Sequence, residues 1–188
     1  NKGNEVMIYV IIGIVILVAL YIVSAYNNLV KNKNMVEEGW SGIDVQLKKR
    51  SNLIPNILSS VKGYMKHEKS LLEKITALRA KSDSADNVLD QAKAESSLSG
   101  SLMNLFAVAE NYPELKANEN FLDLQKQLQE IEDEIQMARR YYNGTVRNNN
   151  VLVESFPSNI IANSFNFGKF DFFEIEDPSV KEVPKVEF

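Results

Sequence analysis

The sequence has no cysteine, one histidine and eight glycines among its 188 residues. Without cysteine the chain forms no disulfide, offers no thiolate nucleophile and holds no cysteine-ligated metal. A single histidine excludes a di-iron helical bundle, which needs repeated Glu-x-x-His motifs. The net charge of −4 argues against a nucleic-acid partner. We therefore expect the chain to bind no metal, no cofactor and no nucleic acid.

Charge is also missing from a long stretch near the N-terminus. The run from Val6 to Tyr26 contains no charged residue. As a helix that rises ~1.5 Å per residue it would extend about 31 Å, which matches the hydrocarbon thickness of a bilayer. We predict a single transmembrane helix with membrane lipid as its partner. Representative positions of this span are Val6, Ile11, Val15, Ala19 and Tyr26.

A cleaved signal peptide is the alternative, because Val23-Ser24-Ala25 resembles a cleavage site. The run is longer than the usual ~7–15-residue apolar core of a signal peptide, which favours a retained span. The first residue is Asn rather than Met, so we expect further residues upstream. Lys31 and Lys33 follow the span and only Lys2 precedes it, so the positive-inside rule favours a cytoplasmic domain on a single-pass cell-membrane protein.

The chain after the span shows helical periodicity. Apolar residues recur at steps of three and four, which predicts helices over residues 27–66, 67–82 and 86–111. Pro55 should kink or interrupt the first of these helices. Arg50 falls near the apolar seam of the same helix. It either pairs with an acid of another helix or snorkels from the helix edge, and we favour snorkelling.

The clearest periodicity lies between residues 118 and 150. Seven apolar residues follow one another there at alternating steps of three and four, which is a heptad pattern. It predicts a fourth helix with Glu132 on its solvated side. Four such helices pack most simply as an antiparallel bundle, although the seam could instead pair with a second copy of the chain. The expected bundle core includes Trp40, Ile43, Leu47, Leu124, Leu128, Ile131 and Ile135.

The last part of the chain is rich in phenylalanine and acidic. Seven of the nine phenylalanines lie from Phe156 onward, and six acids accompany two lysines from Asp171 to the end. Pro157 and two later prolines argue against helix, so we expect irregular structure or short strands. This tail either packs on its own bundle or docks on a second copy or another protein. The candidate interaction residues are Phe165, Phe167, Phe170, Phe172, Phe173 and Phe188.

Several motifs in this chain resemble the LemA family. After the span they include Trp40, Arg50 and the run Leu53-Ile54-Pro55-Asn56. Further on, Tyr112-Pro113-Glu114-Leu115, Arg139-Arg140-Tyr141-Tyr142-Asn143 and the closing Pro184-Lys185-Val186-Glu187-Phe188 fit the same pattern. The resemblance implies a bacterial protein with a short N-terminal tail, one membrane helix and a helical-bundle domain. It implies no catalytic residue.

The sequence as a whole predicts an all-α chain in three parts: residues 1–26 with the span, a bundle over 27–150, and the tail over 151–188. We expect a non-enzymatic membrane-anchored scaffold that forms homo-oligomers through its bundle and tail. The alternative is an adaptor that presents a client or regulator to other membrane proteins. His67-Glu68 is no zinc-protease motif, because Leu71 stands where a second histidine is needed.

Overall fold

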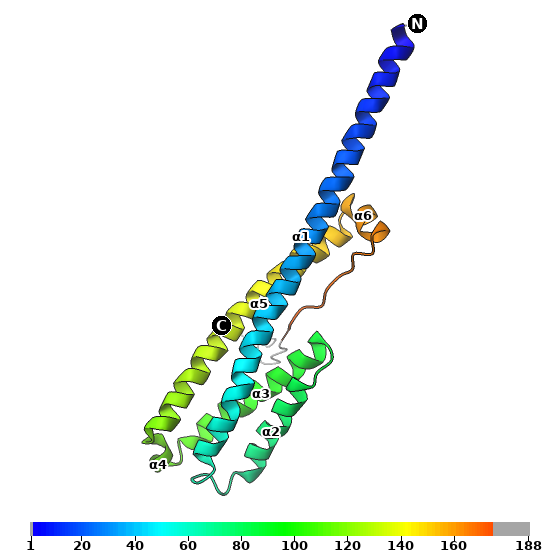
Figure 1. Ribbon diagram of the computed structural model, residues 1–188. Helices are drawn as coiled ribbons and strands as arrows, with labels where there is room; N and C mark the ends of the chain where they lie inside the picture. The colour runs from blue at the N-terminus through cyan, green and yellow to red at the C-terminus, as the bar shows by residue number, and fades with distance from the viewer. Residues whose placement is uncertain (1, 175–188) are drawn as a thin grey trace, which may run out of the picture. The chain divides into compact units, whose positions relative to one another are not determined.

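The computed structural model describes residues 2–174, and every regular element within that range is a helix (Figure 1). The prediction of an all-α chain is therefore confirmed for these residues. The helices are α1 (Lys2–Val61), α2 (Lys69–Asp83), α3 (Val88–Ala109), α4 (Pro113–Lys116), α5 (Glu119–Glu154) and α6 (Ser158–Ser164).

Helix α1 runs without a break through Pro55 and ends at Val61. Of the two expectations for this proline, the break in the helix was wrong, and the kink stays a prediction. Proline removes one backbone hydrogen bond and crowds the preceding turn. Ile54 and Ile57, on either side of it, are both fully buried. Their burial favours the helical path, since each contributes roughly 1.5–3 kcal/mol when removed from water.

The described residues form two compact units. The first unit contains residues 2–40 and 141–170, and the second contains residues 41–140 and 171–174. Helices α1 and α5 each contribute to both units. The boundaries predicted at residues 26 and 150 stay a prediction, and α5 itself continues to Glu154.

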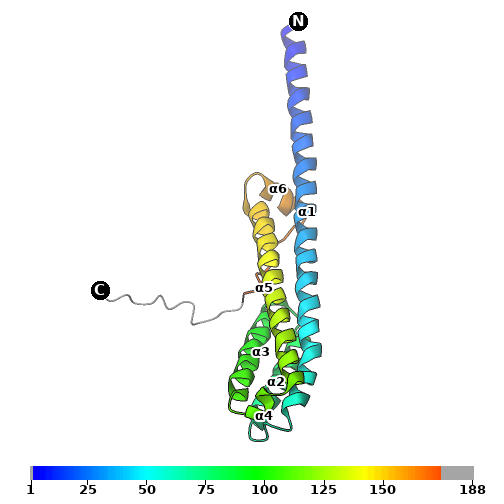
Figure 2. The same ribbon diagram turned by 90° about the vertical axis from the view of Figure 1, so that its left-hand side faces the viewer.

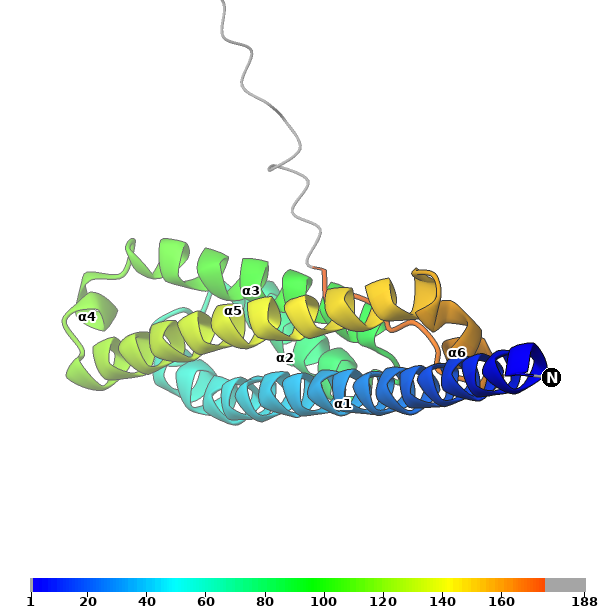
Figure 3. The same cartoon turned by 90° about the horizontal axis from the view of Figure 1, so that it is seen from above.

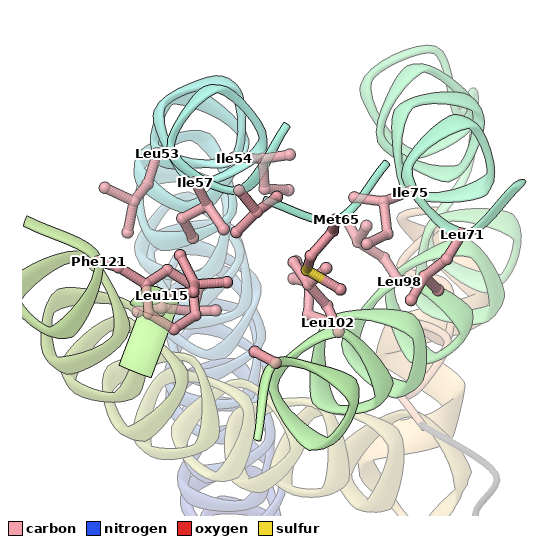
Figure 4. Packing of buried hydrophobic residues seen from close by; sticks show 14 residues of the cluster. Leu53, Ile54, Ile57, Met65, Leu71, Ile75, Leu98, Leu102, Leu115 and Phe121 are labelled. Atoms are coloured by element: carbon pink, nitrogen blue, oxygen red, sulfur yellow. The ribbon is translucent and has the colours of Figure 1, made fainter. Parts of the chain in front are cut away.

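The second unit is built around one apolar core. Helices α2 and α3 form a hairpin and lie side by side (Figure 1). Side chains from α1, α2, α3, α4 and α5 meet in the cluster of Figure 4. Asn87 begins α3 by accepting a hydrogen bond from the Asp90 backbone N–H at 2.8 Å. Members labelled in the figure include Leu53, Ile57, Met65, Ile75, Leu98, Leu102, Leu115 and Phe121.

The heptad seam of α5 is turned toward its own chain. Every seventh residue of the seam is buried, and the residues between them are half-buried. The buried residues are Phe121, Leu128, Ile135 and Tyr142, and the half-buried ones include Leu124 and Ile131. Of the α1 residues expected in the core, Ile43 and Leu47 are buried.

The first unit brings three helices together. Leu29 of α1 and Ile161 and Ala162 of α6 form a small buried cluster, with Leu152 and Val153 of α5 against it. The ring of half-buried Trp40 packs on Tyr142 with centroids 5.5 Å apart.

Helix α6 lies beside α1 when the first unit is viewed from two further directions (Figure 2; Figure 3). We did not predict this helix, because Pro157 was taken as a barrier to helix. Pro157 instead stands directly before α6, at its N-cap. At the start of a helix the N–H that proline lacks would have no partner within the helix anyway.

Candidate functional site: an exposed apolar helix and a buried ion cluster

The first candidate site is the apolar part of α1. An 18-residue window of this helix has a mean hydropathy of 3.1, and none of that window is buried. Individual side chains of this segment are more than half exposed, for example Ile11 at 52%, Val15 at 61% and Leu17 at 67%. A helix with apolar residues on every side and no charge has the composition of a membrane span. By length and composition, α1 is one candidate membrane-spanning helix among the described residues.

Aromatic residues pack together at the end of this apolar segment. The ring of Tyr26 meets Phe165 edge-on at 4.9 Å between centroids and Phe167 at 5.6 Å. Edge-to-face pairs of this kind contribute about 0.5–1.5 kcal/mol each beyond the area they bury. Phe165 and Phe167, both predicted as interaction residues, therefore contact their own chain at Tyr26.

The other predicted interaction residues have different surroundings. The Phe170 backbone N–H donates to Asn150 Oδ1 at 2.9 Å, and the Asn150 amide donates back to the Phe170 carbonyl at 2.9 Å. Phe172 is half-buried and Phe173 is fully buried. Phe188 lies outside the described residues.

The second candidate site is a buried ion cluster in the second unit, formed by Arg50, Glu95 and Glu132. The Arg50 guanidinium is 1% exposed and forms ion pairs with Glu95 of α3 and Glu132 of α5. It also donates to Ser99 Oγ at 2.6 Å. Arg50 therefore does not snorkel, and that expectation was wrong. Glu132, expected on the solvated side, is half-buried with its side chain 24% exposed, because it pairs with Arg50. The core closes over Arg50, so two carboxylates replace its contact with water.

Hydroxyl groups extend the ion cluster to α2. Ser82 Oγ donates to Glu95. Beside Arg50, Ser51 Oγ donates to Asp83 at 2.8 Å and accepts from Arg79 Nε at 2.9 Å. The network thus joins α1, α2, α3 and α5. This network can hold four helices in one register, because any slip would leave a buried charge unpaired.

A signal for Glu95 was present in the sequence. Glu95 stands three residues after Ala92 and three before Leu98, on the apolar face of α3. A carboxylate at such a position needs a cationic partner within the core. Arg50, the one cation that falls on the apolar seam of α1, is that partner.

The remaining polar groups mark surface contacts. No group of three or more His, Asp or Glu that could hold a metal occurs in the part of the chain that the structure describes.

Partial burial and the nearby Glu68 carboxylate, 3.4 Å away, raise the pKa of the half-buried Tyr112 hydroxyl. The Glu154 carboxylate, bound at 2.7 Å, raises the pKa of Lys169 above its ordinary value of 10.5. The stability that the Lys169 charge contributes is therefore present up to pH 10.5 as long as the Glu154 carboxylate is ionised, and it is lost as the pH rises through the folded-state value of Lys169.

These features define a class: helical proteins with one candidate membrane-spanning helix near the N-terminus. The chain belongs to the LemA family, whose family model matches residues 39–188. A similar protein is Protein LemA of Metamycoplasma hominis, which is 27% identical over 165 residues, covering 86% of this chain and 72% of that protein. The resemblance seen in the sequence motifs is thereby confirmed.

Proposed function

We propose that this chain is a non-enzymatic scaffold anchored in a bacterial membrane, where it self-assembles through its helical bundle and its tail. One observation carries the proposal. The exposed apolar residues 6–23 belong to the same unbroken helix that supplies Ile54 and Ile57 to the core of the second unit. A lipid-embedded helix would then be continuous with a packed, water-exposed module. The proposal assigns no catalytic residue.

The ion cluster supports the rigidity that a scaffold requires. Arg50 with its two carboxylates ties α1 to α3 and α5 within the second unit. Removing one member of such a buried pair typically costs about 3–5 kcal/mol, so alternative packings of these helices are disfavoured.

An uncharged face of α3 supports self-assembly. Residues 96–109 carry no charge, and Met103 is 72% exposed within this stretch. Gly100 and Ala107 are exposed beside it and are small enough to let another helix approach closely. A second copy of the chain could therefore cover this face without removing any charged group of this part of α3 from water.

Extraction of membranes at alkaline pH tests the anchoring. A helix inserted across the bilayer resists carbonate, whereas a peripheral protein is released. We expect the intact chain to sediment with the membranes after carbonate treatment. Recovery in the supernatant would contradict membrane anchoring.

Site-specific cross-linking tests the assembly. The chain has no cysteine, so Met103→Cys introduces a single thiol. With a thiol-reactive bifunctional reagent in native membranes we expect a linked pair of copies. Lys81→Cys, on the exposed surface of α2, is the control and should link less. Monomers alone from Met103→Cys would count against a scaffold, whereas a link to a different protein would favour the adaptor.

The side of the membrane is a separate part of the proposal. Lys31 and Lys33 directly follow the apolar segment, so the positive-inside bias supports a cytoplasmic second unit. In intact cells, a membrane-impermeant maleimide should fail to label Lys33→Cys and should label it once the cells are opened. Labelling of intact cells would place this part of the chain outside.

A further inference from the structure

The segment from Ser155 to Gly168, here called the α6 loop, carries no charged residue. Its two ends are held together. The flanking residues Glu154 and Lys169 form an ion pair at 2.7 Å. The amide of Asn149, five residues before Glu154, donates to the carbonyl of Gly168 at 3.1 Å. The loop is therefore closed at its base by polar contacts and is uncharged beyond them.

The inner side of the α6 loop packs on α1 at the end of its apolar segment. Ile161 and Ala162 are buried against Leu29, with Ala25 nearby. Asn166 ends α6 in the left-handed region with φ 56°, and the Phe167 N–H then donates to the Ala162 carbonyl at 2.9 Å. This helix end directs Phe167 back onto the small buried cluster of Leu29, Ile161 and Ala162.

The outer side of the loop presents large apolar side chains. Phe156 is 80% exposed, Ile160 is 54% exposed and Phe165 is 52% exposed. The residues between them in the sequence are proline, serine, asparagine, alanine and the buried Ile161, and none of them is charged. Exposed apolar side chains without interspersed charge are unusual on a surface that faces water, and they are typical of surfaces that contact lipid or protein.

We propose that the α6 loop docks on the bilayer that α1 crosses, with Phe156, Ile160 and Phe165 inserted at the boundary between headgroups and acyl chains. Lipid is the occupant favoured by position, because Phe165 touches Tyr26, which ends the apolar segment that starts at Val6 of α1. In this arrangement the exposed apolar side chains of the loop adjoin the apolar segment of α1. The Glu154–Lys169 pair then lies on the aqueous side of the contact. This inference rests on the proposed insertion of α1.

Quenching of tryptophan by brominated lipid tests the docking. In a Trp40→Phe background, single tryptophans are introduced as Phe156→Trp in the loop, Leu17→Trp in the apolar segment and Met103→Trp on α3. All three sites are exposed, so the substitutions disturb no core. The full chain is reconstituted in vesicles of phosphatidylcholine and phosphatidylglycerol that contain phosphatidylcholine brominated near the top of its acyl chains.

We expect emission from Phe156→Trp to fall at least about twofold, because an interfacial side chain buried ~5–10 Å reaches the brominated carbons. Leu17→Trp should also be quenched, and Met103→Trp should not. Quenching at residue 17 without quenching at residue 156 would overturn the docking and leave the anchoring intact. No quenching at residue 17 would overturn the anchoring itself.

A spin label gives a second readout that does not depend on the preference of tryptophan for interfaces. Ile160→Cys introduces the single thiol to which a nitroxide is attached. In the same vesicles without bromine, the nitroxide should be more accessible to oxygen than to a water-soluble nickel complex. Low accessibility to both reagents would mean that protein covers the loop, as in docking between copies, and would overturn the lipid contact.

Discussion

Arg50 illustrates how single residues decide the packing of the second unit. It is the largest fully buried side chain among the described residues, and its charge is balanced by Glu95 and Glu132. Glu95→Gln keeps the shape of the side chain but removes one of the two neutralising charges. We expect the free energy of unfolding to fall by about 1.5–3 kcal/mol, since the buried guanidinium loses its more deeply buried charged partner and keeps only the partly exposed Glu132. Urea unfolding of the detergent-solubilised chain, followed by circular dichroism, measures this change.

The control for Glu95→Gln is Glu130→Gln on the exposed side of α5. The free energy of unfolding of this variant should stay within about 0.5 kcal/mol of that of the original chain. Adding Arg50→Met to Glu95→Gln should cost less than the sum of the two single changes, because both single changes remove the same ion pair. Equal stability of the Glu95→Gln and Glu130→Gln variants would contradict the role of the ion cluster.

Two glycines of α1 provide a matched pair. A Cβ at Gly39 would lie 3.2 Å from the Tyr142 Cα and 3.3 Å from a ring carbon of Tyr141, whereas a Cβ at Gly42 would meet nothing within 4 Å. Gly42→Ala should therefore stabilise the chain by about 0.8–1 kcal/mol through helix propensity alone. Gly39→Ala should be about 1–3 kcal/mol less stable than Gly42→Ala, because it forces α1 away from α5 in the first unit. The same urea titration compares the two variants. Equal increases in the free energy of unfolding would show that α1 and α5 adjust to the added methyl group without cost.

At the scale of elements, α6 depends on how it ends. Asn166 adopts a left-handed conformation, which asparagine tolerates and β-branched residues avoid. Asn166→Val should cost about 1–2 kcal/mol locally, so exchange of the Phe167 amide hydrogen should become about 5–30-fold faster. Hydrogen exchange followed by mass spectrometry or NMR measures this rate.

Two further variants control for the Asn166 change. Asn166→Gly should preserve the protection of the Phe167 amide, because glycine adopts the same backbone conformation without strain. Asn163→Val lies on the exposed side of α6 and should accelerate exchange much less, since valine costs only about 0.7 kcal/mol within a helix. If Asn166→Val left the Phe167 amide fully protected, the helix end would not control the loop.

At the scale of the whole molecule, the proposed membrane anchoring depends on the apolar segment of α1. Val15 lies near the middle of the uncharged run, so Val15→Lys should cost about 3 kcal/mol on membrane insertion. We expect a measurable fraction of this variant to be released by alkaline carbonate. Val15→Leu, which keeps the site apolar, should remain fully with the membrane. Complete retention of Val15→Lys would mean that residue 15 does not lie in the hydrocarbon core.

The sequence by itself determined the all-helical class, the apolar segment and the family. Each of these depends on local pattern. Periodic apolar residues specify helices, a charge-free run of sufficient length specifies a candidate span, and motifs such as Tyr112-Pro113-Glu114-Leu115 are recognisable in order along the chain. The heptad of α5 likewise marked the side of that helix that is buried.

Only the tertiary structure decided which charges are buried and how the tail begins. Arg50, Glu95 and Glu132 are 37 or more residues apart in sequence, so no local pattern pairs them. Pro55 and Pro157 read as helix breakers, yet core packing carries α1 past Pro55, and α6 starts directly after Pro157. For the ion cluster and for Pro55 the physical reason is the same. Burial against distant residues outweighs the local preference of a single side chain, and sequence spacing does not reveal which distant residues those are.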